Sequence, residues 1–264
     1  MAVMQAGDTT ALDALGPTNA PGRPRLLSYV GRWGRARRWL PDDARRVLDV
    51  GCAFGYGTAA LMGKDRLVIG VEQDAAHLAE ARRRFPHVPI LRADAGDLPI
   101  EDGAVDAVVM LDVLEHVADP SAVVAELRRV LRPGGVLIVS VPHRGLLARL
   151  DSLNVYPALR RRWPSWPPLE AAEHSASDTH RHFGADELRD LLGPRFAVDR
   201  VARSGLGLAE LFHLAILVLV KALLGWPRVY RALMGVHLLA YLIDDAIPAG
   251  RLGYYVTVRA GAVR

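Results

Sequence analysis

Short apolar runs alternate with segments of helical periodicity between residues 46 and 141. Each run has the length of a strand and lacks the polar alternation of a half-exposed strand, which is typical of strands buried on both faces. Strands of this kind form parallel sheets that helices cover on both sides, so we expect an α/β fold. The expected strands are 46–50, 67–71, 88–91, 105–111 and 136–141, and the expected helices among them are 58–62, 74–84 and 119–131.

The remainder of the 264-residue chain has a different character. Residues 1–24 are rich in Ala, Gly, Pro and Thr, and we expect a mobile tail followed by a single domain over residues 25–264. After residue 142 the regular alternation ends. We expect a basic amphipathic helix at 25–40, a lid-like segment at 143–183, a helix at 185–192, strands at 196–203 and 254–259, and an apolar helical insertion at 204–252.

Composition excludes several classes of protein. Hydrophobic residues make up 51% of the chain and charged residues 23%, which excludes a disordered or collagen-like protein. The net charge is +4, and the arginine-rich stretches match no nucleic-acid-binding module, so no nucleic-acid partner is expected. A single cysteine, Cys52, and the lack of a basic, apolar leader favour the reducing cytoplasm. The most apolar stretch, 206–226, contains three ionisable residues and is too polar for a confident membrane span.

A glycine-rich turn joins the first expected strand to the first helix. The segment Val47–Thr58 reads VLDVGCAFGYGT. Glycines let a ligand approach the backbone closely, and the start of a helix offers free N–H groups. Asp49, directly before the turn, would repel a pyrophosphate but attract a cationic amine or sulfonium. The turn therefore indicates a binding site for a ligand with positive charge.

This turn resembles the first motif of the class I S-adenosylmethionine-dependent methyltransferases, an acid followed by three glycines at alternate positions. The matching residues are Asp49, Gly51, Ala53 and Gly55, with alanine in place of the middle glycine. Further stretches match in order and spacing over about residues 44–142: VIGVEQD, RADAGDLP, VDAVVMLDVLEHVADP and LRRVLRPGGVLIVSVP. The resemblance implies a Rossmann-like, seven-stranded and mostly parallel methyltransferase sheet with helices on both faces. The helical insertion would separate the last two strands.

The resemblance also assigns the residues that bind S-adenosyl-L-methionine. Glu72 ends the second strand, where the family's acid holds the ribose hydroxyls, and Gln73 would lie against the adenine. Asp94 and Ala95 follow the third strand, where the family contacts the adenine amino group. Leu111 ends the fourth strand and completes the expected cofactor site.

Two other functions remain open. Gly55, Gly57 and Ala60 also fit the dinucleotide fingerprint G-x-G-x-x-A, with Glu72 as the ribose acid, which would indicate an NAD-type oxidoreductase. That interpretation leaves Asp49 and Asp94 without a role. A non-catalytic cofactor-binding or membrane-associated accessory protein is the other alternative, and turnover of S-adenosylmethionine would exclude it.

Methyl transfer from a sulfonium needs alignment of the reactants and, for many acceptors, removal of a proton. His143 directly follows the fifth strand, and His116 and Asp112 follow the fourth, so all three are candidate catalytic residues at the ligand side of the sheet. His116 also suits a role in shaping the cofactor pocket. A polar cluster in the lid-like segment matches no zinc pattern, and we assign no metal; it comprises Glu173, His174, Asp178, His180 and His182.

The insertion at 204–252 would lie beside the acceptor pocket, because the family's last turn lies at the active-site edge. On a helix, Glu210, His213 and Lys221 fall within one narrow arc, and the remaining surface is apolar. We therefore expect a small or lipid-linked apolar acceptor. The candidate histidine bases, and the lack of an acidic cluster that would bind an amine, favour O-methylation of this acceptor.

Two interpretations of the apolar surface compete. The helices form an enlarged substrate cap, or they lie in the interface of an anionic membrane. The second would make a cytoplasmic protein peripheral at the inner face of the membrane. It draws support from basic residues beside tryptophans, which suit anionic headgroups: Arg160–Arg162 with Trp163 and Trp166, and Arg32, Arg35, Arg37 and Arg38 with Trp33 and Trp39.

Overall fold

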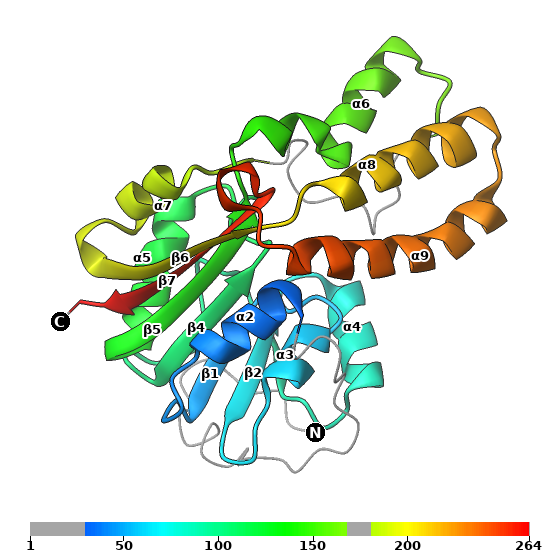
Figure 1. Cartoon of the computed structure of the whole chain (residues 1–264). Helices are drawn as coiled ribbons and strands as arrows, with labels where there is room; N and C mark the ends of the chain where they lie inside the picture. Colours follow the sequence, from blue (N-terminus) through cyan, green and yellow to red (C-terminus); the bar gives the residue numbers. More distant parts are fainter. Residues whose placement is uncertain (1–29, 168–180, 264) are drawn as a thin grey trace.

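The computed structural model describes residues 30–167 and 181–263, so the tail expected at 1–24 lies outside the described residues. Its strands are β1 (Arg46–Val50), β2 (Leu67–Glu72), β3 (Ile90–Arg92), β4 (Val105–Leu111), β5 (Leu131–Pro142), β6 (Phe196–Ser204) and β7 (Tyr255–Ala262). They form one seven-stranded sheet in the order β3-β2-β1-β4-β5-β7-β6 (Figure 1). Strand β7 runs antiparallel to both of its neighbours, β5 and β6, and the other strand pairs are parallel. The expected Rossmann-like, mostly parallel sheet is confirmed.

Helices cover both faces of the sheet, and each face has its own apolar cluster. On one face lie α2 (Gly31–Trp39), α3 (Tyr56–Leu61) and α4 (Ala75–Arg84), which bury Ala36, Leu61 and Leu78. On the other lie α5 (Pro120–Val130) and α7 (Ala185–Leu192), which bury Leu127 and Leu188. Continuous apolar strands are therefore explained, because both faces of the central strands are covered.

Local capping signals set where two of these helices begin. Asp74 accepts a hydrogen bond from the backbone of His77 and caps α4. Asp119 does the same for α5, and Pro120 occupies the first helical position. These boundaries agree with the expected ones.

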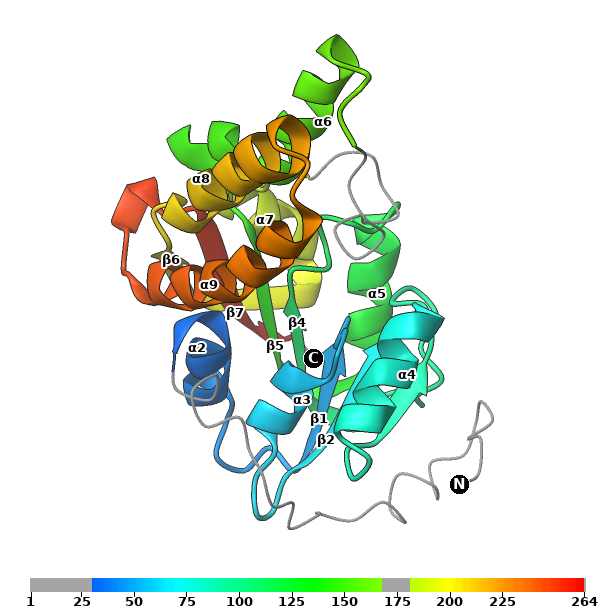
Figure 2. The ribbon, with the colours of Figure 1, turned by 90° about the vertical axis from the view of Figure 1, so that its right-hand side faces the viewer.

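A helical cap lies beyond the carboxyl ends of the parallel strands (Figure 1 and Figure 2). It consists of α6 (Ser152–Arg162), α8 (Leu208–Ala215), the π-helix η4 (Ile216–Leu223) and α9 (Pro227–Ala246). The cap has its own small core, in which Tyr156, Leu217 and Tyr230 are buried. Within residues 30–167 and 181–263, the 3-10 turns are η1 (Leu146–Leu150), η3 (Gly193–Arg195) and η5 (Gly250–Leu252).

Two expectations about elements need correction. The segment after residue 142 is expected to be irregular, yet α6 forms there with Pro157 inside the helix. Asp151 caps α6 through the backbone of Leu153, and the buried ring of Tyr156 anchors it. Strand β5 is expected to begin at residue 136, after the Pro-Gly-Gly turn. It begins at Leu131 instead, because Leu131 pairs with Val105 of β4. Among the described helices, none is both long and apolar enough to cross a membrane.

Candidate functional site

The carboxyl ends of β1, β2 and β4 lie side by side and form the centre of the site. Val50, the last residue of β1, pairs with Val71 of β2 and Met110 of β4. Because parallel strands end at one edge of the sheet, the residues that follow them share that edge. The structure thereby brings together the glycine-rich turn, Glu72 and Asp112.

The turn from Gly51 to Gly55 has the backbone shape that the motif predicts. Gly51 and Gly55 have φ values of +75° and +79°, and Ala53 has φ +44° in a region that side chains rarely adopt. A Cβ on Gly51 would lie 2.1 Å from a methyl group of Val113, so a side chain does not fit there. The glycine at Gly51 is thus required both by its backbone angle and by close packing.

Glu72 holds the turn in place. One carboxylate oxygen accepts a hydrogen bond from the backbone N–H of Ala53 at 2.9 Å, and the other accepts from the N–H of Asp74 at 2.8 Å. The residue is 8% exposed. Each carboxylate oxygen can accept more than one hydrogen bond, so Glu72 retains capacity for hydroxyl donors from a ligand.

Asp49 is a second buried carboxylate beside this turn. It is 4% exposed, and it accepts a hydrogen bond of 2.7 Å from the hydroxyl of Thr58. Burial raises the pKa of Asp49 to about 6, the Thr58 hydrogen bond opposes the shift, and the charge of Glu72 adds to it. Burial and the same two carboxylates raise the pKa of the Cys52 thiol, which makes Cys52 a poor nucleophile.

These features fit a cationic ligand rather than a pyrophosphate. Two neighbouring buried carboxylates cost free energy unless a positive charge compensates them. An ammonium or sulfonium group would provide that charge, whereas a phosphate would increase the repulsion. The residues present therefore suit S-adenosylmethionine better than a dinucleotide.

The other expected cofactor residues lie around the same edge. Gln73 is exposed after β2, and its carbonyl accepts a hydrogen bond from Arg92. Asp94 is exposed after β3 and accepts from the N–H of Gly96 at 2.8 Å. Ala95 and Leu111 are half-buried and pack against the two clusters that flank the sheet. Their contacts with a cofactor stay predictions.

Asp112, a candidate base, is already engaged by two side chains. One carboxylate oxygen is ion-paired with the guanidinium of Arg32, and the other accepts from the hydroxyl of Tyr241 at 3.2 Å. Asp112 also has a positive φ of +58°. To take a proton from an acceptor, Asp112 would have to give up one of these contacts. The arrangement favours a positioning role.

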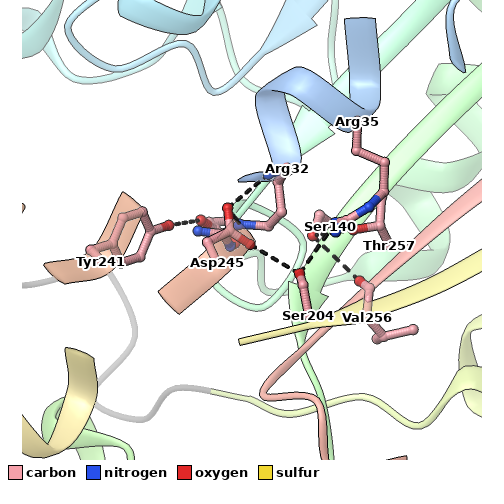
Figure 3. Close-up of polar contacts among 9 residues, drawn as sticks. Arg32, Arg35, Ser140, Ser204, Tyr241, Asp245, Val256 and Thr257 are labelled. Atoms are coloured by element: carbon pink, nitrogen blue, oxygen red, sulfur yellow. Dashed lines mark hydrogen bonds and ion pairs between the residues drawn. The ribbon is translucent and has the colours of Figure 1, made fainter. Parts of the chain in front are cut away.

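Arg32 is the centre of a polar network that joins α2, α9 and the sheet (Figure 3). It is 3% exposed, its backbone N–H and its guanidinium both donate to Asp245, and its guanidinium carbon lies 3.6 Å from the ring centroid of Tyr255. Asp245 in turn accepts from Ser204, at 3.0 Å. The network continues through Arg35, Thr257 and Ser140.

This network corrects the expectation that the arginines of α2 face anionic headgroups. Arg32 points into the protein, Arg35 donates to Ser204 and Thr257, and Arg37 donates to carbonyls at 60 and 62. Sequence reasoning missed Arg32 as a site residue. Its partners Asp112 and Asp245 lie 80 and 213 positions away, so no local pattern separates it from the other arginines of the helix.

The two candidate histidines occupy different places. His116 is half-buried in the turn between β4 and α5, and its backbone N–H donates to Val113. His143 leans toward the β6–β7 side, where its Nδ1 lies 3.1 Å from the carbonyl oxygen of Gly253. Burial, together with the positive charge of Arg203, lowers the pKa of His143. His143 is therefore neutral at pH 7, as a general base must be.

The polar cluster of the lid-like segment is only partly within the described residues. Glu173, His174, Asp178 and His180 lie outside them. His182 is described, and its Nε2 lies 3.0 Å from the buried carboxylate of Asp151. Among the described residues, no group of three or more His, Cys, Asp or Glu side chains is arranged to hold a metal ion.

Known proteins that resemble this chain in sequence or in structure include methyltransferases. Residues 48–139 match the family model described as a methyltransferase domain. A protein of Mycolicibacterium smegmatis named a probable S-adenosylmethionine-dependent methyltransferase is 45% identical over 100 residues, which cover 38% of this chain and 39% of that protein. A demethylmenaquinone methyltransferase of Clavibacter sepedonicus is 33% identical over 130 residues, covering 46% of this chain and 53% of that one.

Solved structures match over more of the chain. A Thermotoga maritima S-adenosylmethionine-dependent methyltransferase, titled a possible histamine N-methyltransferase, covers 90% of this chain and 91% of its own, with a TM-score of 0.58 and 20% identity. A Haemonchus contortus phosphoethanolamine N-methyltransferase in complex with S-adenosyl-L-methionine covers 94% of this chain and 54% of its own, with a TM-score of 0.58 and 18% identity. At these identities the likeness shows the fold. This chain spans less than two fifths of the length of the mycobacterial relatives that it matches in sequence.

Proposed function

We propose that this chain, which carries a class I S-adenosylmethionine-dependent methyltransferase domain, transfers the methyl group of S-adenosyl-L-methionine to an oxygen atom of a small or lipid-linked apolar acceptor. The observation that carries the proposal is the pair of buried carboxylates around the glycine-rich turn. Asp49 and Glu72 are both nearly inaccessible and sit at the ends of β1 and β2. A cationic cofactor is the ligand that offsets their charge.

In the mechanism, the chain mainly binds and aligns the reactants. S-adenosylmethionine, when bound, supplies an electrophilic methyl group on a sulfonium. Glu72 would accept hydrogen bonds from the ribose hydroxyls while it holds the turn through the N–H of Ala53, and Asp49 would attract the positive charge of the cofactor. Arg32 and Tyr241 fix Asp112 at the end of β4, next to the glycine-rich turn. Alignment of this kind can supply much of the rate enhancement of a displacement.

Transfer to oxygen is supported by a neutral histidine, His143, which directly follows β5, the strand that pairs with β4. The carbonyl of Gly253 can only accept, so the Nδ1 of His143 carries the proton and its Nε2 keeps a lone pair. Within the described residues, that Nε2 has no hydrogen bond. A hydroxyl acceptor benefits from such a base, and a neutral amine acceptor needs it less.

Turnover with a panel of hydroxylated acceptors tests the proposal. The unmodified chain should convert S-adenosylmethionine to S-adenosylhomocysteine with at least one phenol or alcohol and label its oxygen. His143→Ala should lower the chemical rate by about 10²–10⁴ and leave cofactor affinity nearly unchanged. Methyl transfer to amines alone would overturn the choice of oxygen. Cofactor binding without turnover on any acceptor would favour the accessory protein.

The cap also supports a membrane-bound acceptor. Along α9, apolar side chains at helical spacing face solvent: Val229 is 41%, Val236 52%, Leu239 53% and Ile243 60% exposed. Helix α8 exposes Leu208 and Leu211, and η4 exposes Leu219 and Leu223. A group of exposed apolar side chains on neighbouring helices usually marks an interaction site.

The cap helices are turned so that their polar residues face inward. Glu210 accepts from Ser152, His213 is buried, and Lys221 lies over the ring of Tyr230 at 4.9 Å. Arg161, Arg162 and Arg228 of the cap are exposed, and Trp163, which follows the first two, is exposed as well. Apolar side chains with basic and aromatic neighbours suit the interface of an anionic bilayer.

Liposome flotation tests this part of the proposal. The chain should float with vesicles that contain phosphatidylglycerol at low salt. Leu219→Glu combined with Leu223→Glu should abolish flotation, because both side chains are exposed and their loss leaves the cap core intact. Val263→Glu, at an exposed apolar position directly after β7, is the matched control and should float. If the chain stays at the bottom of the gradient, it does not bind the vesicles, and the cap helices only cover the substrate.

A further inference from the structure

We propose that His213 and His237, here called the imidazole pair, bind a hydroxyl group of the methyl acceptor inside the cap. This inference rests on the proposed function and adds the chemical group that the cap recognises. The two rings stack with centroids 4.7 Å apart and planes 24° apart. They come from α8 and α9, so the pair lies between the two helices of the insertion.

A chain of hydrogen bonds sets the protonation of His213. The Ser152 hydroxyl donates to a carboxylate oxygen of Glu210 at 2.7 Å, and the Ser152 backbone N–H reaches the same oxygen at 3.3 Å. A hydroxyl has one proton, so the Ser152 oxygen must accept at its other contact, the Nδ1 of His213 at 2.9 Å. Nδ1 therefore carries the proton of a neutral ring, and Nε2 carries the lone pair.

The lone pair of His213 faces a buried position that lacks a donor. His213 is 7% exposed, and within the described residues its Nε2 has no hydrogen-bond partner. Burial lowers the pKa of His213 to about 4, electrostatic interactions with His237 and Lys221 add to the shift, and the carboxylate of Asp151 opposes it, so the ring is neutral at pH 7. A buried acceptor without a donor costs about 1–3 kcal/mol. A ligand that brings an O–H would recover that free energy.

His237 repeats the pattern on the neighbouring helix. One of its ring nitrogens bonds to the backbone of Ala209, and its Nδ1 is buried without a partner among the described residues. The stacked pair thus presents two acceptor nitrogens and no donor. The side chain of Lys221 lies near enough to oppose positive charge at His213, which favours a neutral hydroxyl over an ammonium group.

The imidazole pair is connected to the methyl-transfer site through one turn of α9. The ring of His237 lies 6.4 Å from that of Tyr241, and the hydroxyl of Tyr241 donates to Asp112 at the end of β4. The ring of Phe212 also stacks with His237, with centroids 6.5 Å apart. An acceptor held by the pair would extend between aromatic walls toward the end of β4.

Nitrogen-resolved NMR of the full chain with ¹⁵N-labelled histidine tests the inference, with phenol as the probe and anisole as its control. Anisole keeps the shape of phenol and lacks the donor. The spectrum should show His213 protonated on Nδ1, with signals assigned through His213→Gln and His237→Gln. Phenol should shift the bare nitrogens of both rings, and anisole should leave them unchanged. Ser152→Ala should let His213 populate both tautomers, although the fold and cofactor binding persist.

Three results would overturn the inference. The first is a His213 ring that carries its proton on Nε2. The second is that phenol, up to its solubility limit, does not shift the ¹⁵N signals of the unprotonated ring nitrogens. The third is that phenol and anisole shift these signals equally. Calorimetry with S-adenosylmethionine on the same sample separates the two proposals. If the cofactor binds and phenol causes no shift, only the proposal for the imidazole pair is wrong. If the unmodified chain does not bind the cofactor, the proposed function is wrong.

Discussion

Asp49 makes cofactor affinity depend on pH. Its pKa of about 6 lies above the ordinary 3.8 because the carboxyl group is buried. A cation binds the ionised form, so affinity for S-adenosylmethionine should be lost as the pH falls through about 6, by about tenfold between pH 7 and pH 5. Asp49→Asn should bind more weakly and show no such dependence in this window. Calorimetric titrations at both pH values check this, and an equal dependence in the two proteins would contradict it.

The same shift has a consequence for stability without cofactor. Because folding raises the pKa of Asp49, the folded state takes up a proton below about pH 6 before the unfolded state does. This residue should therefore stabilise the free chain as the pH falls from about 6 toward 4. His213 acts in the opposite direction in the same range, since folding lowers its pKa from 6.5 to about 4.

Glu72 should contribute directly to cofactor binding. A charge-assisted hydrogen bond is worth about 1.5–3 kcal/mol, so Glu72→Ala should weaken S-adenosylmethionine binding about tenfold or more. The change also removes the acceptor for the N–H of Ala53 and loosens the turn. Asp65→Ala, an exposed acid just before β2 at the far end of that strand, is the control and should bind normally. Unchanged calorimetry for Glu72→Ala would remove the ribose assignment.

At this scale, the sequence identifies residues whose role depends on near neighbours. Asp49, Gly51 and Glu72 could be found because the turn and two strand ends place them in a recognisable order. Arg32 and Ser152 could not, because their partners arrive from distant parts of the chain. A buried arginine and an exposed one look the same in a basic helix.

The glycine-rich turn gives a prediction about one element. Gly51→Ala adds a Cβ that would lie 2.1 Å from Val113 at a φ of +75°. Gly134→Ala is a matched control, because Gly134 has φ +73° and open space around it. The control should lose about 1–2 kcal/mol of stability from backbone strain and keep cofactor binding. Gly51→Ala should lose more and bind no cofactor; equal denaturation curves and equal binding would contradict the account of the turn.

Helix α2 should depend on one side chain for its attachment. Arg32→Ala leaves the buried carboxylate of Asp245 without its guanidinium partner, and removal of one member of a buried pair costs about 3–5 kcal/mol. Arg38→Ala, an exposed position on the same helix, should change stability by less than about 0.5 kcal/mol. Urea unfolding of both variants measures the difference. Similar midpoints would show that the network in Figure 3 does not anchor the helix.

Elements were predictable where a local signal starts or ends them. The expected bounds of β1, β4 and α7 agree with the structure to the residue. The sequence does not predict helix α6, because Pro157 suggests a loop. The N-cap formed by Asp151 and the packing of Tyr156 against Trp166 stabilise the helix despite the proline. Tertiary contacts of this kind are absent from any local window of sequence.

At the scale of the whole molecule, the sequence could not predict which faces of the cap helices point inward and which face solvent. The sequence places Glu210, His213 and Lys221 in one arc, and a polar arc normally faces water. In the structure Glu210 and His213 face Ser152, and some of the apolar side chains, among them Leu211 and Leu219, face outward. The partner that decides the orientation is α6, the helix that the sequence does not reveal.

Calorimetric titration of the full chain with S-adenosyl-L-methionine tests the central claim most directly. The account predicts saturable binding at pH 7 that S-adenosylhomocysteine competes with, and no binding of NADH, because the turn is lined by the buried carboxylates Asp49 and Glu72. Binding of NADH with no response to S-adenosylmethionine would contradict the account.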